Sequence, residues 1–331
     1  MTDAPAPNLD SLTARAMAAS DGRASGLRLL DDRGTLALVL DVTGLEGESP
    51  AALEGEVRAA LLAEPGIAEV RIAMTRSRKA MAIIAVGSGK GGVGKSTLAT
   101  NIAIALKRQG RKVGLVDADI YGPSQPRLMG IEGQRPEAQG AKLIPVMGPH
   151  GVALLSTGQI AAPGQAIAWR GPMAGKALDQ LIDAVWGDTE LLIVDLPPGT
   201  GDVQLSMISK HKPLGAVIVS TPQDLALMDA TRAIGLFEQA DVPIIGMVEN
   251  MAGYLCPHCG EFSDPFGSGG AEAAARTMGL DFLGRVPLDI GIRTASDAGA
   301  PPAALDDALA QPFLAIAARI GAWLDARTGA S

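Results

Sequence analysis

The sequence has few of the residues that mark several common protein classes. Only two of its 331 residues are cysteine, too few for the disulfide framework of a small secreted domain, and aromatic residues make up only 3%, so the core must be aliphatic. No uninterrupted apolar run approaches the ~18 residues that a membrane-spanning helix needs. The first seven residues lack the basic and apolar stretches of a secretory signal. We therefore expect a cytoplasmic protein with no membrane partner.

An excess of positive charge is also missing. The formal net charge is -8, which gives no electrostatic reason to expect a nucleic-acid partner. Hydrophobic residues nevertheless make up 47% of the chain and charged residues 19%, so a disordered chain is excluded. The 41 glycines indicate loops whose backbone comes close to a ligand, and phosphates are the usual ligands of such loops.

Two domains are expected from the length and from the breaks in the hydrophobic pattern. Residues 1–22 read as a polar, Ala-rich lead, expected to be mobile, with at most one short helix. A small α+β unit follows, and its predicted elements are a strand, a helix and a strand over residues 36–42, 50–63 and 67–74. The basic stretch 75–79 reads as a linker. The predicted domains are therefore residues 1–78 and 79–331.

The larger part has the pattern of a parallel sheet covered on both faces. Short continuous apolar runs, typical of strands that are buried on both sides, are separated mostly by helical segments. These runs lie at residues 83–86, 113–116, 152–155, 191–194, 216–219 and 243–248. Residues 313–324 have apolar side chains at helical spacing and predict a packed terminal helix. The fold class expected is α/β, with a doubly wound, mostly parallel sheet.

A phosphate-binding loop lies directly after the first of these runs. Residues 89–96 read Gly-Lys-Gly-Gly-Val-Gly-Lys-Ser and fit the pattern G-x-x-x-x-G-K-[ST] between a strand and a helix. We expect Lys95 to contact the β- and γ-phosphates of a nucleotide and Ser96 to bind Mg²⁺ through its hydroxyl. The residues expected to bind the nucleotide here are Gly89, Lys90, Gly91, Gly92, Val93, Gly94, Lys95, Ser96 and Thr97.

Two later strands end in carboxylates. The run 113–116 is followed by Asp117 and Asp119, and the run 191–194 ends in Asp195. Parallel sheets bind ligands at the carboxyl ends of their strands, and Asp195 has the Walker B form that binds Mg²⁺ directly or through water. The stretch 197–202, Pro-Pro-Gly-Thr-Gly-Asp, combines a stiff turn with glycines and suits a loop that senses the γ-phosphate.

The two cysteines stand together in Cys256-Pro257-His258-Cys259-Gly260. Such a knuckle holds a metal between two thiolates, but tetrahedral zinc sites and cubane clusters need four ligands. The missing pair must come from another molecule. Three interpretations remain open from the residues: a dithiol redox site, a zinc ion bridged by two subunits, and a bridging [4Fe–4S] cluster.

In their order, the phosphate loop with its extra Lys90, the Asp-x-Asp, the Pro-Pro-Gly-Thr-Gly-Asp stretch and the C-x-x-C resemble the Mrp (ApbC-type) iron–sulfur cluster carriers, deviant Walker A P-loop ATPases. The resemblance covers residue 80 to near the C-terminus. It implies a homodimer that binds ATP and Mg²⁺, holds a [4Fe–4S] cluster on Cys256 and Cys259, and delivers the cluster to apo iron–sulfur proteins. The small first domain resembles other iron–sulfur assembly factors in layout only, because it has no cysteine.

The resemblance also implies individual roles. Lys90 would reach the nucleotide of the partner subunit, Asp119 would position or activate the attacking water, and Asp117 would lie beside the Mg²⁺ shell. Asn250, after the run 243–248, matches the position that hydrogen-bonds the adenine, and the stretch 169–173 matches a family segment without a known chemical role. The rival function is a positioning ATPase of the ParA and MinD kind with a zinc-bridged dimer, which would need a basic membrane helix or DNA-binding face.

Overall fold

The computed structural model describes residues 8–31, 33–43, 45, 49–75, 81–160 and 172–329. The chain divides into two compact units, Met1–Ala80 and Met81–Ser331. The boundary expected between residues 78 and 79 falls in the stretch 76–80, outside the described residues.

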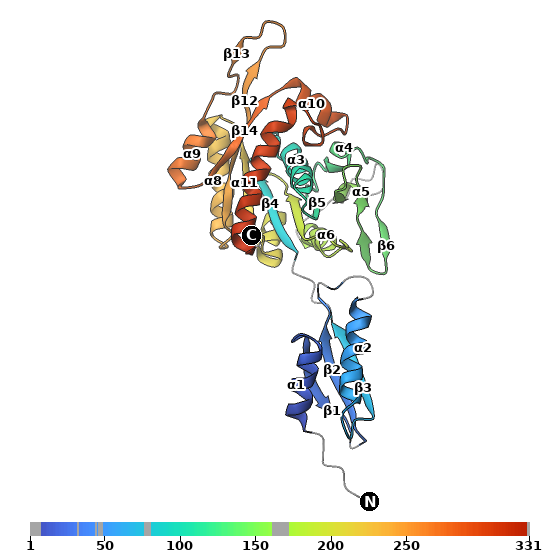
Figure 1. The fold of residues 1–331 in the computed structure, drawn as a ribbon. Coiled ribbons are helices and arrows are strands. Elements are labelled where there is room, and N and C mark those ends of the chain that lie inside the picture. The colour runs from blue at the N-terminus through green and yellow to red at the C-terminus, as the bar shows by residue number, and fades with distance from the viewer. Residues whose placement is uncertain are drawn as a thin grey trace, which may run out of the picture. The chain divides into compact units, whose positions relative to one another are not determined.

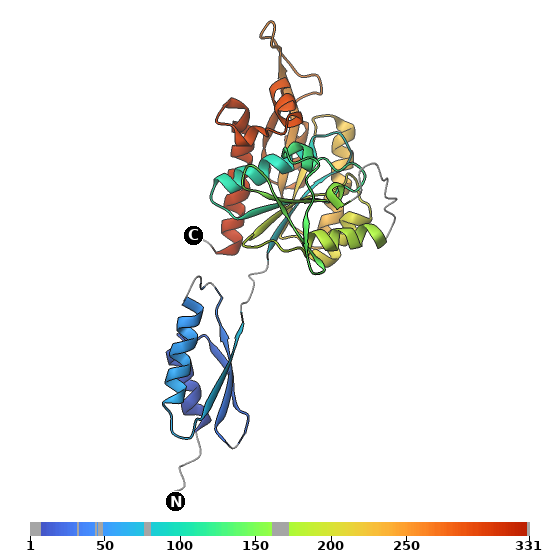
Figure 2. The same ribbon diagram turned by 90° about the vertical axis from the view of Figure 1, so that its right-hand side faces the viewer.

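In the first unit, helices pack on one face of a three-stranded sheet. Figure 2 shows both helices on the same side of the sheet. Its elements are α1 (Leu9–Ala19), β1 (Ala24–Leu29), β2 (Thr35–Asp41), α2 (Ser49–Leu62) and β3 (Glu69–Thr75). The strand order is β1-β2-β3, with β1 antiparallel and β3 parallel to β2.

Helix α1 is the short helix expected within residues 1–22, but it packs into the core of this unit, which corrects the expectation of mobility for residues 9–19. The Asn8 side chain caps the helix by accepting from the backbone N–H groups of Asp10 and Ser11. Leu12 and Ala16, one turn apart, are both buried and belong to the core of this unit. Strand β1 was not predicted, because its sequence Ala-Ser-Gly-Leu-Arg-Leu has only two large apolar residues and begins with small residues that do not indicate a strand.

The second unit has the predicted α/β architecture (Figure 1). The strands described in it are β4 (Ala82–Ser88), β5 (Val113–Asp117), β6 (Glu137–Gln139), β7 (Lys142–Ile144), β8 (Val146–Met147), β9 (Ala153–Ser156), β10 (Leu191–Asp195), β11 (Gly215–Ser220), β12 (Ile244–Leu255), β13 (Phe262–Ser263) and β14 (Phe282–Leu288). The helices are α3 (Lys95–Arg108), α4 (Gln125–Leu128), α5 (Thr157–Ile160), α6 (Pro172–Ile182), α7 (Asp202–Ser206), α8 (Asp224–Glu238), α9 (Gly270–Met278), α10 (Ile290–Asp297) and α11 (Gln311–Thr328). A π-helical turn, Met207–His211, continues α7, and two short 3-10 turns, Pro302–Ala304 and Ala308–Ala310, precede α11.

Within the described residues, the main sheet has nine strands in the order β13-β12-β11-β4-β10-β5-β9-β8, with β14 paired to β12. The pairings are parallel except for β8 with β9 and β13 with β12. Successive residues of a strand face opposite sides, so Ile84 packs in the layer with α3 and α11, and Ile83 packs in the layer with α6, α8 and α9. The predicted doubly wound sheet is therefore confirmed.

Strand β12 is longer than predicted. The apolar run suggested an end at residue 248, with Asn250 after the strand, but β12 continues to Leu255 and contains Asn250. The continuation depends on partners that are distant in sequence, because β14 and β13 pair with residues of its second half. A register shift against β14 and a positive φ of 59° at Met251 mark a bulge there.

Candidate functional site

The phosphate loop joins β4 to α3 at the carboxyl edge of the sheet. Gly92 and Gly94 have φ values of 80° and 81°, in the left-handed region that glycine adopts without strain. The N-cap residue of α3 is Gly94, which has no side chain to bond the N–H groups of the first turn. Helix N-termini of this kind bind anions through these groups and the helix dipole. The loop therefore has the geometry of a phosphate site.

Close packing fixes the start of the loop. A Cβ atom at Gly89 would lie 2.0 Å from the backbone carbon of Asp229 in α8, so no larger residue fits. The Ser88 hydroxyl donates to the carbonyl of Lys90 at 2.9 Å. The Lys90 ammonium itself donates to Gln223 of the same chain at 3.3 Å.

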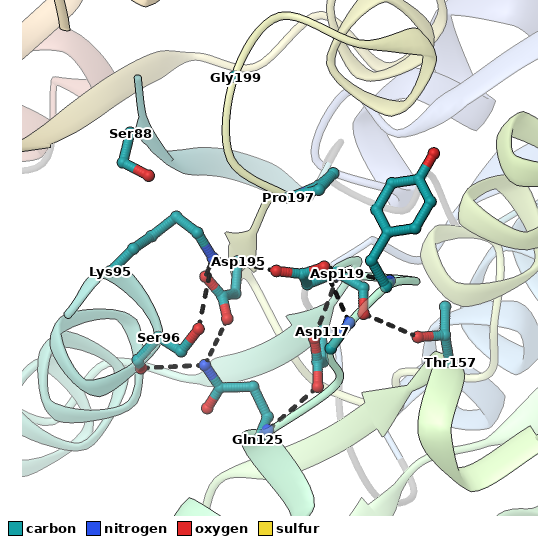
Figure 3. A network of polar contacts seen from close by, with 12 residues as sticks. Ser88, Lys95, Ser96, Asp117, Asp119, Gln125, Thr157, Asp195, Pro197 and Gly199 are labelled. Carbon is teal, nitrogen blue, oxygen red and sulfur yellow. Dashed lines mark hydrogen bonds and ion pairs between the residues drawn. The ribbon is translucent and has the colours of Figure 1, made fainter. Parts of the chain in front are cut away.

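Lys95 lies at the centre of a buried polar network (Figure 3). Its ammonium forms an ion pair with Asp195 and lies 4.0 Å from an oxygen of Asp119 and 3.3 Å from the Ser96 hydroxyl. Strands β5 and β10 are in register, with Asp117 directly opposite Asp195. The side chains that the sequence placed at two strand ends therefore lie side by side.

Asp117 is fully buried behind this group. Its carboxylate accepts hydrogen bonds from the backbone N–H of Gln125 at 3.0 Å, the Ser156 hydroxyl at 2.9 Å and the backbone N–H of Asp119 at 3.2 Å. Burial, and next the neighbouring Asp195 carboxylate, raise the pKa of Asp117 to about 7. These contacts make Asp117 an anchor for the loop that carries Asp119.

Asp119 faces the ligand side instead. One of its oxygens accepts from the backbone N–H groups of Tyr121 and Gly122, both at 3.2 Å, which fixes the carboxylate. Its side chain is 13% exposed. It lines a cavity of about 250 Å³. The other residues on the wall of this cavity are Ser88, Lys90, Gly91, Gly92, Gly94, Lys95, Ser96, Thr97, Ser124, Leu128 and Pro198. This cavity lies over the phosphate loop.

Sequence reasoning missed Gln125, which is completely buried in the same network. Its side-chain amide donates to Asp195 at 2.8 Å and to the carbonyl of Ser96 at 3.0 Å, and its oxygen accepts from the Thr100 hydroxyl. Gln125 thus holds the Walker B carboxylate against the start of α3. The local sequence carries no signal for this role, because every side-chain partner is distant along the chain.

The stretch 197–202 closes over the phosphate loop. The Gly199 N–H donates to the carbonyl of Ser88 at 2.9 Å, and Gly199 has a φ of 88° that only glycine adopts freely. Gln204 donates to the carbonyls of Pro197 and Gly199 and so ties the stretch to α7. Pro198 lines the phosphate cavity. The stretch is therefore tied both to the start of the phosphate loop and to α7.

Asn250 lies beside the phosphate loop from the other side. Its side-chain amide donates to the carbonyl of Val93 at 2.8 Å. It lines a second cavity of about 220 Å³, whose wall includes Leu98, Leu128, Asn250, Met251, Val286, Pro287, Leu288, Asp289, Ile292 and Phe313. Gly94, Thr97 and Leu128 line both cavities. A largely apolar cavity next to a phosphate site suits a nucleoside.

The cysteines lie in the turn of a hairpin between β12 and β13, at the end of the unit (Figure 1). The Cys256 N–H donates to the carbonyl of Glu261 at 3.0 Å, and the Gly260 N–H donates to the carbonyl of Cys256 at 2.9 Å, with a φ of 72° at Gly260. Hydrogen bonds from the backbone N–H groups of Cys259 and then His258 lower the pKa of the Cys256 thiol. Both cysteines are free, and Cys259 is exposed.

This hairpin offers an incomplete metal site. Within the described parts of the chain, no group of three or more His, Cys, Asp or Glu side chains could hold a metal ion. A four-ligand site on this hairpin therefore needs two ligands from another molecule. The stretch 161–171, with Trp169 and Arg170, lies outside the described residues.

Comparison with protein families and curated proteins gives a consistent result. Residues 79–321 match the family described as ParA: NUBPL iron-transfer P-loop NTPase. A Deinococcus radiodurans protein named iron-sulfur cluster carrier protein is 44% identical over 83% of this chain and 82% of its own length. The Escherichia coli K12 protein of the same name is 49% identical over 66% of this chain and 60% of its own length.

Solved structures agree on the fold. A nucleotide-binding protein from Archaeoglobus fulgidus, in complex with ADP, is 39% identical and has a TM-score of 0.58 over 66% of this chain and 86% of its own. The cell division ATPase MinD from Pyrococcus furiosus is 23% identical, with a TM-score of 0.56 over 73% of this chain and 99% of its own, and shares the fold alone. The family match and the curated relatives, and not these structures, disfavour the alternative of a positioning ATPase. No helix in the described ranges is long and apolar enough to cross a bilayer.

Proposed function

Because the chain belongs to the iron-transfer P-loop NTPase family, which includes iron–sulfur cluster carriers, we propose that it binds and hydrolyses ATP and carries a [4Fe–4S] cluster across a homodimer for transfer to apoproteins. The observation that carries the cluster half is the pair Cys256 and Cys259, which supplies two thiolates at the turn of a hairpin and has no third ligand in the described chain.

The nucleotide half rests on two adjoining cavities. The phosphates would lie on the N–H groups of the loop and the first turn of α3, with Lys95 at the β- and γ-phosphates. The adenine would lie in the apolar cavity, within reach of Asn250, whose amide carbonyl can accept while its NH₂ donates to Val93. The shared wall at Gly94 and Thr97 connects the two parts.

The residues present fit a magnesium ion. Ser96 lines the phosphate cavity, and the buried Asp195 carboxylate contacts the Lys95 ammonium beside it, so two oxygen ligands of the kind that Mg²⁺ prefers lie close together at this site. Ser96 and Asp195 would hold the ion, with Asp117 beside its shell. A bound Mg²⁺ would neutralise charge that develops on the phosphates. Asp119, held by two backbone N–H groups, would orient the attacking water and accept its proton.

Lys90 and the dimer belong to the same proposal. In one chain Lys90 contacts Gln223 and lines the phosphate cavity. We propose that it exchanges this contact for the nucleotide of a second subunit, so that ATP brings the two chains together. The recipients of the cluster would be apo iron–sulfur proteins.

Anaerobic reconstitution of the full chain with iron and sulfide tests the cluster half. We expect about one [4Fe–4S] cluster per dimer, from the need for four thiolates, and no cluster in Cys256→Ser/Cys259→Ser. Metal analysis of the isolated protein separates iron from zinc. A full cluster in the double variant, or one cluster on a monomer, would overturn the proposal.

Steady-state ATP hydrolysis tests the proposed nucleotide site. Lys95→Ala should abolish measurable ATP hydrolysis, since it removes the ammonium at the phosphates and the positive charge that pairs with Asp195. Lys107→Ala is the matched control, because Lys107 lies in the last turn of the same helix and lines neither cavity. Equal turnover in the two variants would remove Lys95 from the mechanism.

A further inference from the structure

An exposed apolar pair stands at the base of the cysteine hairpin. Leu255 is 63% exposed and Phe262 is 64% exposed, and the two residues are direct partners across β12 and β13. Residues that pair directly across two strands point to the same face of the ribbon. The turn that follows Leu255 begins with Cys256, so the apolar pair adjoins the thiolates.

The backbone holds the Phe262 ring in place. A Cβ atom at Gly253 would lie 2.5 Å from the ring, so the ring packs directly on the Gly253 backbone. Gly253 has a φ of 75° and precedes Leu255 by two positions, on the same face of the strand. Because Gly253 has no side chain, one side of the Phe262 ring packs on the backbone there, while the other side is exposed. The exposure of Phe262 is therefore built into the hairpin rather than left by a loose side chain.

From this arrangement we infer that Leu255 and Phe262 pack against the same residues of a second copy of this chain and form an apolar seal around the shared cluster. The inference rests on the proposed function. A cluster that takes two thiolates from each of two identical chains lies on their two-fold axis. Residues beside that axis meet their own copies, where apolar side chains complement one another and like charges repel. Leu255 directly precedes Cys256, and Phe262 pairs with Leu255, so both apolar side chains lie close enough to the shared cluster to meet their copies.

The seal would limit the access of solvent to the cluster, because the apolar shell around a metal site controls that access. Two thiolates per chain leave much of a cluster open to water, chelators and oxygen unless neighbouring side chains cover it. The apolar pair is far smaller than the area that a stable interface buries, about 1,200 Å² or more. It would therefore protect the cluster, while the rest of the interface holds the dimer.

The test compares the cluster lifetimes of reconstituted full-length proteins. The wild type and Phe262→Ser are loaded anaerobically, and a ferrous chelator is added while the cluster absorption is followed. We expect the same cluster content per dimer in both proteins and about tenfold faster loss in Phe262→Ser. Leu255→Ser should act in the same direction. The control is Met147→Ser in β8, because Met147 is equally exposed, at 64%, and lies away from the hairpin.

The outcomes separate this inference from the proposed function. A wild type that holds no cluster overturns both. A wild type that holds one cluster per dimer, with the same rate of loss in Phe262→Ser, overturns the seal alone. A wild-type rate of loss combined with slower transfer to an apo-ferredoxin would show that the pair faces a recipient protein, and would also overturn the seal.

Discussion

The side-chain amide of Gln125 donates a hydrogen bond to the Asp195 carboxylate at 2.8 Å, across 70 residues of sequence. The same amide donates to the carbonyl of Ser96, so one side chain connects the end of β10 with the start of α3. The position of the Walker B carboxylate relative to the phosphate loop therefore depends on a residue of neither motif.

Replacing Gln125 by Met should lower both stability and ATP turnover. The change removes three hydrogen bonds of the buried side chain, to Asp195, to the carbonyl of Ser96 and from Thr100, which costs about 1–3 kcal/mol of unfolding free energy. A displaced carboxylate should lower kcat by about 10²-fold. Denaturant unfolding and steady-state hydrolysis measure the two effects. Gln134→Met, at an exposed position, is the control. Unchanged kcat in Gln125→Met would show that Asp195 needs no such support.

Gly89→Ala should destabilise the folded chain. The added methyl group would meet the backbone of Asp229 at 2.0 Å, and neither the loop nor α8 can yield without losing packing. We expect the free energy of unfolding, measured with heat or denaturant, to fall by about 1–3 kcal/mol. Gly91→Ala is the matched control, since its nearest neighbour would be a Pro198 carbon at 3.7 Å. Equal stability of the two variants would contradict the close contact with α8.

Much of this site could be predicted because its signals are contiguous in sequence. The phosphate loop is a single stretch between a strand and a helix. The meeting of Asp117 and Asp195 follows from two parallel strands that end at one edge. Gln125 and the second half of β12 could not be predicted in the same way. Gln125 looks like any polar residue in a loop, and β12 continues past Asn250 only because β13 and β14, later in the chain, provide partners.

Glu249→Ala should destabilise the segment that follows the cysteine hairpin and leads into α9. Glu249 is fully buried on β12 and accepts hydrogen bonds from the N–H groups of Gly269 and Ala271 and from Arg285. Removing this charged acceptor should cost about 2–3 kcal/mol.

This destabilisation should also appear as faster amide hydrogen exchange over residues 264–271. Glu272→Ala serves as the control, because Glu272 bonds to Arg285 as well but is 34% exposed, so its loss should cost less than about 1 kcal/mol. Equal effects of the two changes would mean that the N–H contacts of Glu249 do not anchor α9.

Cys256 should react as a thiolate at lower pH than an ordinary cysteine. The N–H groups of Cys259 and His258 favour its charged form and lower its pKa, so the thiolate persists to a lower pH in the folded chain than in the unfolded chain. Cys259→Ser keeps both backbone donors and leaves one thiol, whose alkylation by iodoacetamide can be followed against pH. We expect the midpoint to lie below that of the same protein in urea. Coincident profiles would show that the turn does not prepare Cys256 for metal, which only the deprotonated sulfur binds.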